Sequence, residues 1–349
     1  MSRWGFSSLF KGKDSSAEPA TSYEDADDGG SGRGGAIGAG IIVLVIFCGL
    51  SWYWSREPGL SLPYKASDTH TVTGVAITTS LIATVDVLLD KPGGLLSNDI
   101  MPPSVFLDNI PNWEYGVIIQ IRDLAKAMRE SFSRSQSQST EDGDLALAEP
   151  RFNFDHDSWM LPASEKQYRE GRNYVQGYLK RLLDDDEYNA QFFARADNLR
   201  YWLSTVETRM GSLSQRLSAS VGQKRINVDL AGDSAASRST RVPDELVVKT
   251  SWTELDDIFY EARGTSWALI HFLKAAQIDF AEILEKKNAK VSLEQIIREL
   301  EATQQPLHSP LVLNGSGFGL MANHSLTMAS YLSRANAAII DLRDLLTRG

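Results

Sequence analysis

The chain has 349 residues, and its 45 aspartates and glutamates outnumber its 35 lysines and arginines, which gives a formal net charge of -10 at pH 7. This acidic balance argues against nucleic acid or an anionic lipid surface as the main partner. A single cysteine, Cys48, excludes an intramolecular disulfide. Any folded domain must therefore be held together by its own buried apolar surface.

Residues 1–35 are expected to form a disordered tail. They are rich in serine, glycine and aspartate, and so few apolar side chains cannot offset the entropy that ordering would cost. One alternative stays open, because Trp4, Phe6 and Phe10 lie close to the basic residues of the tail. Such a pattern would also suit a short amphipathic segment on a membrane surface.

Residues 36–54 are predicted to be a transmembrane helix. The segment begins at Ala36, ends at Trp54 and has no charged side chain, and a helix needs about 20 apolar residues to cross a bilayer. A cleaved signal peptide is the rival interpretation, but its apolar run would be only about 7–15 residues long and would start closer to the N-terminus. The run also ends in bulky aromatics, where a signal peptidase needs small side chains.

The distribution of lysine and arginine predicts the orientation of this helix. Basic residues are more frequent before the span, at Arg3, Lys11, Lys13 and Arg33, than just after it, at Arg56 and Lys65. The side with more lysine and arginine is normally cytoplasmic. We therefore expect a cytoplasmic N-terminus and a periplasmic domain at residues 55–349, anchored by a single pass in a bacterial inner membrane.

Small residues four apart lie at the start of the predicted span. Gly34 pairs with Gly38, and Ala36 pairs with Gly40. Pairs of this kind let two transmembrane helices pack closely, so a homodimer is one interpretation. They are also frequent in single spans, and this alternative stays open.

Apolar residues recur at alternating steps of four and three along three later segments, which is heptad spacing. The three seams are Phe192, Ala196, Leu199, Leu203, Val206, Met210, Leu213 and Leu217; Leu255, Ala262, Ser266, Leu269, Leu273, Ala276, Phe280 and Ile283; and Leu320, His324, Met328, Tyr331, Ala335, Ala338 and Leu342. Shorter helices are predicted near 74–89, 113–132, 165–183 and 292–304. With no run of alternating strand residues, the fold class is all-α: an antiparallel multi-helix bundle with coiled-coil-like seams.

Helix breakers and caps set the expected boundaries. Pro102, Pro103 and Pro111 predict an extended segment, and polar stretches predict flexible loops near 131–145 and 231–245. Three serines are followed three residues later by Gln or Glu, as in a capping box. These pairs are Ser164 with Gln167, Ser251 with Glu254, and Ser292 with Gln295.

Seven short runs carry a family resemblance. They read LLDKPGG at 88–94, NDIMPP at 98–103, PNWE at 111–114, FSRSQSQSTED at 132–142, LSQRLSASVG at 213–222, FYEARG at 259–264 and NGSGFG at 314–319. The chain resembles a proteobacterial family of single-pass inner-membrane proteins of unknown function. The resemblance covers all but the tail and implies an inner-membrane setting in a Gram-negative cell. It brings no activity, cofactor or catalytic residue.

The residues suggest no catalytic, cofactor or metal site. The histidines are scattered, and none lies in the Glu-x-x-His pattern of di-iron bundles. Asp155, His156 and Asp157 would supply at most three metal ligands, so a polar loop is the favoured interpretation. The glycines at 315–319 would present amides to an anion if they opened a helix. A turn between two helices needs the same glycines, and this interpretation is favoured.

Two function classes are weighed, with an enzyme third. The preferred class is a membrane-anchored scaffold or assembly protein that binds another envelope protein through an exposed helical face or through loops 98–115 and 131–145. Within these loops, one hypothesis is a partner patch in which Trp113 is an aromatic anchor beside the polar side chains of Arg134, Gln136 and Gln138. The other interpretation of Trp113, which is favoured for the aromatic segment 113–115, is a core residue. The alternative is a ligand-sensing periplasmic bundle, although a tail of about 35 disordered residues is a poor signalling output.

Overall fold

The computed structural model describes residues 31–61, 72–136, 138–184, 186, 189–226, 245–309, 311–317 and 319–348. The chain divides into two units, Met1–Cys48 and Gly49–Gly349. Residues 1–30 of the predicted tail lie outside the described residues, as do residues 231–244 of the predicted loop at 231–245.

The first helix, α1, runs Ser31–Trp54. It therefore begins before the predicted boundary at Ala36, and residues 31–35, which the composition assigns to the tail, are helical. Extending an existing helix by a residue costs far less than starting one, so the apolar run can carry its neighbours into the helix. Its segment Gly35–Trp54 is long and apolar enough to cross a membrane, and none of it is buried. Its length and composition are compatible with a membrane anchor or with a signal sequence.

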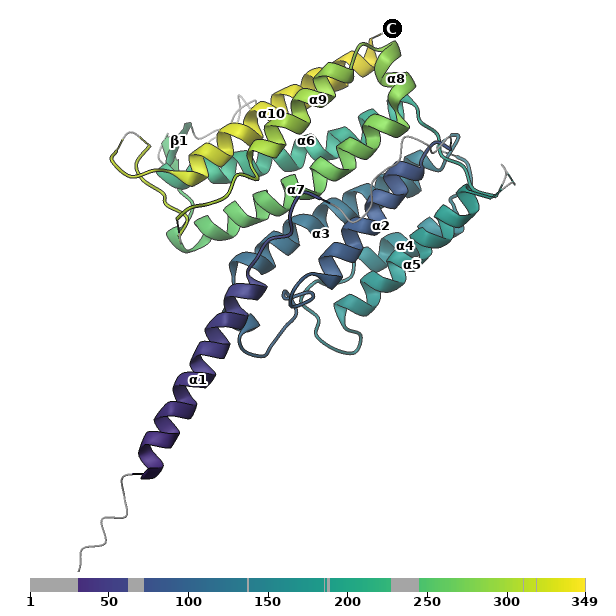
Figure 1. The fold of residues 1–349 in the computed structure, drawn as a ribbon. Coiled ribbons are helices and arrows are strands. Elements are labelled where there is room, and N and C mark those ends of the chain that lie inside the picture. Colours follow the sequence, from purple (N-terminus) through teal and green to yellow (C-terminus); the bar gives the residue numbers. More distant parts are fainter. Residues whose placement is uncertain are drawn as a thin grey trace, which may run out of the picture. The chain divides into compact units, whose positions relative to one another are not determined.

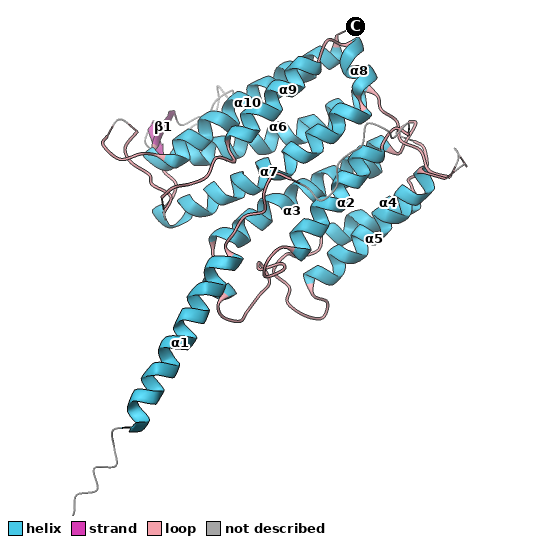
Figure 2. Cartoon of the chain, in the orientation of Figure 1, coloured by secondary structure: helices cyan, strands magenta, loops and turns pink. Residues whose placement is uncertain are grey.

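Within the described residues, nine further α-helices and one small sheet follow (Figure 2). The helices are α2 (Val75–Asp90), α3 (Asn109–Ala127), α4 (Gly143–Phe152), α5 (Ser164–Leu182), α6 (Ala196–Ser218), α7 (Leu255–Asp279), α8 (Ala281–Lys286), α9 (Lys290–Ala302) and α10 (His324–Thr347). Short turns of other helix types are η1 (Ser104–Phe106), η2 (Met128–Phe132), η3 (Ala219–Val221) and η4 (Trp252–Glu254). The strands are β1 (Gln223–Ile226) and β2 (Glu245–Val248).

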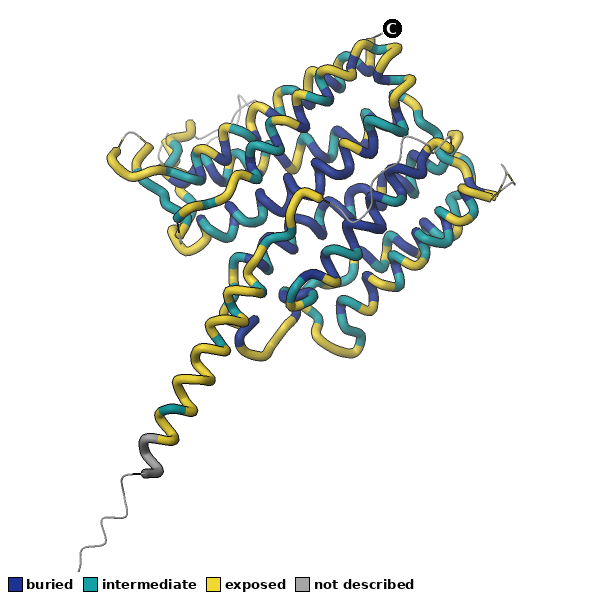
Figure 3. The backbone as a smooth tube through the Cα atoms, in the orientation of Figure 1, coloured by how far each residue is buried: buried dark blue, intermediate teal, exposed yellow. Residues whose placement is uncertain are grey.

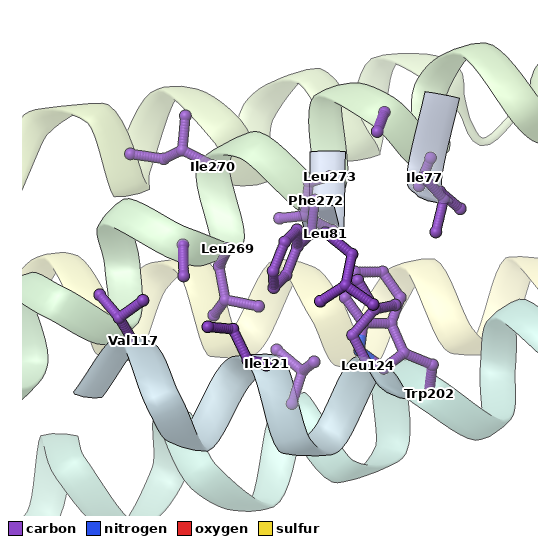
Figure 4. Close-up of a cluster of buried hydrophobic side chains, with 14 of the residues drawn as sticks. Ile77, Leu81, Val117, Ile121, Leu124, Trp202, Leu269, Ile270, Phe272 and Leu273 are labelled. Carbon is purple, nitrogen blue, oxygen red and sulfur yellow. The ribbon is translucent and has the colours of Figure 1, made fainter. Parts of the chain in front are cut away.

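Helix α7 is the central element of the bundle. It packs against α3, α2 and α9, while α10 packs against α6 and α9, and α5 packs against α2 and α4 (Figure 1). Buried segments concentrate along α2, α3 and α7 (Figure 3). Figure 4 shows part of this core, where Leu81 of α2, Ile121 of α3 and Phe272 of α7 meet. The labelled side chains come from α2, α3, α6 and α7, which bury apolar side chains on faces that the 3.6-residue period brings together.

Two glycines allow α3 and α7 to approach closely. A Cβ atom at Gly264 would lie 1.9 Å from the carbonyl oxygen of Trp113, and one at Gly116 would lie 2.2 Å from that of Glu261. No larger residue fits at either position without moving backbone. The contact between α3 and α7 therefore depends on the absence of side chains at these two sites.

The predicted seams lie largely in the core. From Leu199 to Leu217, every seam residue of α6 is buried. The third seam is wrong at its start, because Leu320 precedes α10 and is fully exposed. Asn323 caps α10 instead, with its Oδ1 accepting a hydrogen bond from the amide of Leu326 at 2.8 Å.

Three local predictions are also wrong. Pro111 lies in the first turn of α3 rather than in an extended segment, because a proline lacks only an amide proton that has no partner there. Helix α4 occupies part of the predicted loop at 131–145, with Asp142 as its cap. Strands β1 and β2 form an exposed antiparallel pair in a chain predicted to be all-α, with Gln223 opposite Val248.

The capping boxes are not formed either. Ser164 is the first residue of α5, and its hydroxyl donates to the carbonyls of Asp155 and Ser158. Ser292 lies inside α9, and Ser251 makes no side-chain cap. A serine hydroxyl that donates to a nearby backbone carbonyl is not available for a capping box. The spacing of serine to Gln or Glu therefore occurs here without the cap that it predicts.

A buried ion pair organises the loop between α2 and α3. Lys91 and Glu114 are 1% and 0% exposed, and Lys91 Nζ lies 2.5 Å from Glu114 Oε1. The same carboxylate accepts hydrogen bonds from the amides of Leu96 and Ser97, at 2.9 and 2.8 Å, and from the Ser97 hydroxyl. Lys91 Nζ also donates to the carbonyl of Gly94 at 2.7 Å. Residues 91–97 are thus wrapped around one carboxylate.

The segment that follows α1 is tied to α7. The guanidinium of Arg263 binds both carboxylate oxygens of Glu57, with its Nη2 2.7 Å from Oε2. The indole nitrogen of Trp267 donates to the carbonyl of Gly59 at 3.0 Å. Arg263 Nη1 further donates to the carbonyls of Thr303 and Gln305, so this arginine joins three parts of the chain.

Candidate functional site

Trp113 cannot serve as an exposed anchor. It lies in α3, is completely buried, and its ring centroid is 5.2 Å from that of Trp267. The close approach of Gly264 to its backbone leaves no path for a partner. The prediction that Trp113 lies on the surface is wrong, and the alternative interpretation of this aromatic as a core residue is the correct one.

The polar loop that follows α3 has no exposed aromatic anchor of its own. Gln136 and Gln138 are exposed, whereas Arg134 is half-buried and pairs with Glu141 at 3.7 Å. Arg195 Nη1 donates to the carbonyl of Ser135 at 2.5 Å, which holds the loop against α6. Phe132 at its start is buried. Interfaces draw most of their binding energy from a few large anchors, so this loop alone is a weak candidate.

A better candidate is a groove of about 520 Å³ between η4 and the loop that precedes α10. Trp252 lines it with 81% of its surface exposed, and Leu311 and Met321, which are also exposed, line it from the loop before α10. Three large apolar side chains around one hollow are unusual on a monomer surface and typical of an interaction site. The remaining lining residues are Asp108, Thr253, Leu255, Asp256, Val312, Leu313 and Asn314.

The loop that forms one wall of this groove has a defined conformation. Asn314 and Asn323 form an isolated antiparallel bridge. The amide of Gly315 donates to the carbonyl of Ala322 at 3.0 Å, and that of His324 donates to the carbonyl of Leu313 at 2.7 Å. A Cβ atom at Gly315 would lie 2.3 Å from the carbonyl oxygen of Met321, so glycine is required here. The wall is therefore a short hairpin.

The rim of the groove is acidic. Asp108 caps α3, and Asp256 and Asp257 lie in the first turn of α7. Asp108 and Asp256 line the groove, whereas the neighbouring Asp257 accepts a hydrogen bond from Asn112 at 2.6 Å. Burial, followed by the negative charges of Asp256, Asp108 and Glu254, raises the pKa of Asp257 to about 6. Among the described residues that line the groove, none is basic. A cationic group placed here would lower the pKa of Asp257 and relieve this repulsion.

Sequence reasoning missed this groove for an identifiable reason. Acidic side chains in the first turn of a helix are favoured by the positive end of its dipole. The sequence alone therefore explains Glu254, Asp256 and Asp257 as helix-dipole partners and gives no reason to expect a groove. The one available signal is Trp252, a large aromatic just ahead of a helix and outside every heptad seam. Its neighbours across the groove come from a loop near residue 311 and cannot be inferred from local spacing.

The other predicted site residues are dispersed. Apart from the backbone of their own helix, no atom of the described residues lies within 4 Å of a Cβ placed at Gly38 or Gly40. The surroundings of the Gly34 side-chain position lie outside the described residues. Gly315, Gly317 and Gly319 precede Asn323, the cap of α10, so they do not present amides at the start of that helix. The anion-site interpretation fails on this point.

The histidines do not converge on one site either. In the part of the chain that the structure describes, no group of three or more His, Cys, Asp or Glu side chains is arranged to hold a metal ion. His156 instead packs on Tyr115, with ring centroids 5.0 Å apart. Burial lowers the pKa of His156, and this effect exceeds the opposing influence of Asp157. His271 lies in α7 against Trp267, and His70 lies outside the described residues.

Comparison with known proteins agrees with the family resemblance. Neither the curated proteins nor the solved structures gave a match. Residues 33–349 match a bacterial family described as "Uncharacterized protein conserved in bacteria (DUF2333)". That match spans α1 from Arg33 onward and the whole bundle. The chain is therefore a member of the DUF2333 family of bacterial proteins.

Proposed function

We propose that this protein is a scaffold of the bacterial envelope, anchored by α1 in the inner membrane, that binds another envelope protein at the groove beside Trp252. In this arrangement the N-terminus is cytoplasmic and the unit Gly49–Gly349 is periplasmic. The apolar segment Gly35–Trp54 supports the anchor. The excess of lysine and arginine before the span supports the orientation.

The observation that carries the binding role is the exposed Trp252 beside an acidic groove. A groove of about 520 Å³ accommodates one or two large side chains, and a tryptophan at its edge is the residue type most enriched at binding hot spots. The acidic rim selects for positive charge. The expected partner therefore presents an apolar side chain flanked by lysine or arginine. The proposal assigns the chain no catalytic role and no cofactor.

The anchor is tested with reporter fusions to the full chain. A reporter that is active only outside the cytoplasm should be active when fused after Gly349 and inactive when fused before Ser2. A cytoplasmic signal from the C-terminal fusion would contradict the orientation. Persistence of α1 in the mature protein, measured by its mass, separates an anchor from a cleaved signal.

The groove is tested by site-specific photocrosslinking in intact cells. A photoreactive residue at Met321 should give a discrete adduct whose partner peptide is apolar and basic. Trp252→Ala and the charge reversal Asp256→Lys should each reduce the adduct, and the same residue at Gln136 serves as the matched control. An adduct that survives both substitutions, or a peptide that is acidic, would refute binding at this groove.

The polar loop provides a second comparison. Changing Arg134, Gln136 and Gln138 together to Ala should leave the adduct at Met321 unchanged. Substitutions at exposed positions such as Gln136 and Gln138 usually alter stability by less than about 0.5 kcal/mol. Loss of the half-buried pair of Arg134 with Glu141 adds a modest cost, and the triple variant should still fold. Loss of the adduct in this folded variant would return the docking role to loop 131–145.

A second copy of the chain is a further proposed partner, through α1. The open space at Gly38 and Gly40 supports close helix approach. Gly38→Ile and Gly40→Ile should each lower the dimer fraction in a membrane two-hybrid assay, whereas Ile42→Leu should not. Equal signals from all variants would remove this interface.

A ligand-sensing role is the second candidate function, and one observation favours it. A cavity of about 510 Å³ between α7 and α10 is lined by both apolar and polar groups, including Phe259, Arg263 and His324. Its Arg263 binds Glu57, next to the end of α1. Native mass spectrometry of the protein purified from envelopes should then show a bound small molecule that the cavity-filling variant Met328→Trp loses. If both forms have the same mass apart from the substitution, the scaffold role stands alone.

A further inference from the structure

Two loops at one end of the bundle expose apolar side chains. The first is at residues 100–106 and the second at residues 159–161, and both lie at the lower end of the bundle in Figure 1 and are exposed in Figure 3. Met101 is 70% exposed and Leu161 is 89% exposed. The other exposed apolar residues of the two loops are Ile100, Val105, Phe106, Trp159 and Met160. We refer to residues 100–106 and 159–161 together as the two-loop surface.

These loops are held in place next to each other. The buried amide of Asn98 donates to the carbonyl of Ser158 at 2.9 Å and to Glu165 Oε2 at 2.7 Å. In the first loop, the hydroxyl of Ser104 donates to the carbonyl of Met101 at 2.6 Å. In the second, Leu161 has a φ of 63°, a left-handed conformation that is costly for a leucine. The defined backbone of these loops holds their apolar side chains in solvent. The exposure of these side chains is therefore not the result of a lack of structure.

The two-loop surface lies at the same end of the unit as Trp54, the last residue of α1. A Cβ atom at Gly93 would be 3.0 Å from Trp54 Cγ, so this tryptophan rests on the loop 91–97. That loop is pinned by Glu114 and continues directly into Asn98. Just before Trp54, Trp52 and Tyr53 are exposed, and the guanidinium of Arg56 lies 3.7 Å from the centroid of the Trp52 ring. Exposed aromatics with a stacked arginine are typical of a membrane interface.

We propose that the two-loop surface inserts into the outer leaflet of the same membrane that α1 crosses, and thereby fixes the bundle against the lipid. This inference rests on α1 being a membrane anchor. If the span ends at Trp54, the lipid surface lies at the level of the loop that Trp54 contacts. Trp, Met, Leu and Ile side chains then enter a lipid interface rather than water.

Lipid suits this surface better than a charged partner. Exposed acidic residues, Asp99, Asp155 and Asp157, lie within or beside the two loops. They disfavour attraction to anionic headgroups, so insertion is driven by burial of apolar area. The contact is expected in membranes of zwitterionic lipid and does not require an anionic one.

The test uses the full chain with Cys48→Ser, reconstituted in phosphatidylcholine nanodiscs. Single cysteines at Met101, Met160 or Leu161 carry an environment-sensitive fluorophore. Ile42→Cys in α1 is the positive control, and Val291→Cys, exposed at the start of α9, is the negative control. Doxyl-labelled phosphatidylcholine quenches labels in lipid, and iodide quenches labels in water.

Labels on both loops should be quenched by doxyl lipid, as at Ile42→Cys, and protected from iodide relative to Val291→Cys. Quenching at Ile42→Cys combined with iodide quenching of the loop labels would overturn the insertion while the anchor stands. Loop labels protected from both quenchers would show that protein covers the surface and would overturn lipid as the occupant. An Ile42→Cys label outside lipid would overturn both the anchor and this inference.

Discussion

Glu114→Gln is expected to be among the most destabilising polar substitutions in the bundle. The carboxylate is completely buried, and Lys91, two backbone amides and one hydroxyl converge on it. The substitution preserves shape but removes the negative charge. It leaves the ammonium of Lys91, which is 1% exposed, with neutral acceptors alone, the carbonyl of Gly94 and the new side-chain amide oxygen.

The size of the effect follows from this geometry. Removing one partner of a buried ion pair leaves an uncompensated charge and costs roughly 3–5 kcal/mol. The new amide nitrogen adds to the cost, because it is a donor where the carboxylate accepted hydrogen bonds. A domain is stable by only about 5–15 kcal/mol. Glu114→Gln should therefore remove a large fraction of the free energy of unfolding.

A double-mutant cycle isolates the ion pair. In Lys91→Met/Glu114→Gln no buried charge is left, so the double variant should be more stable than Glu114→Gln alone. The coupling energy between contacting charged residues is expected to be about 1–3 kcal/mol. Glu285→Gln, at an exposed position of α8, is the matched control and should change stability by less than about 0.5 kcal/mol.

The measurement is urea unfolding of the full chain in nanodiscs, followed by tryptophan fluorescence. Trp113 is next to Glu114 in sequence and packs on Trp267, so the emission of this pair reports on the same region. A loss of less than about 1 kcal/mol for Glu114→Gln would show that the charge is not a determinant of stability, against the expected cost of a buried unpaired ion. A double variant no more stable than the single one would also refute the reasoning.

Four further substitutions test the packing of the bundle and its pH dependence. Gly264→Ala should abolish folding or cost several kcal/mol, because its Cβ would lie 1.9 Å from a carbonyl oxygen, whereas Gly211→Ala should stabilise α6 by about 0.5–1 kcal/mol in urea unfolding. Leu203→Ala should cost roughly 2–5 kcal/mol and lower the melting temperature. Burial, then Lys274, lowers the pKa of His271 to about 4. On acidification, His271 therefore binds a proton in the unfolded chain before it does so in the folded chain. The free energy of unfolding should fall by roughly 2–3 kcal/mol from about pH 6.5 to 4, and this decrease should be absent in His271→Gln.

Local periodicity predicted the parts of the fold that depend on one helix at a time. The spacing from Leu199 to Leu217 describes a single face of α6, and that face is buried. Helix α4 was missed because it has only 10 residues and contains Pro150, so its apolar pattern is too short to establish a helical period. Its stability depends on packing against α5, which local propensity does not report.

The candidate site depended on contacts that no local pattern reveals. Trp113 is buried because Gly264 in a distant helix lets α7 approach it, and an aromatic in an amphipathic segment is equally compatible with surface or core. The groove at Trp252 joins three segments that are far apart in the chain. Nothing in the sequence indicates that the carboxylate of Glu114 accepts hydrogen bonds from backbone amides of a preceding loop.

The attachment of Glu57 and Gly59 to α7 also has a mechanical consequence. Tension applied to the chain through the segment after α1 would load the Arg263 guanidinium and the Trp267 indole, both on the central helix. Several hydrogen bonds would have to break together under such a load, rather than one after another as when a terminal helix is peeled away. A force applied on the N-terminal side would therefore act on α7, the best-packed helix of the bundle. The less tightly packed outer helices of the bundle would carry little of this force.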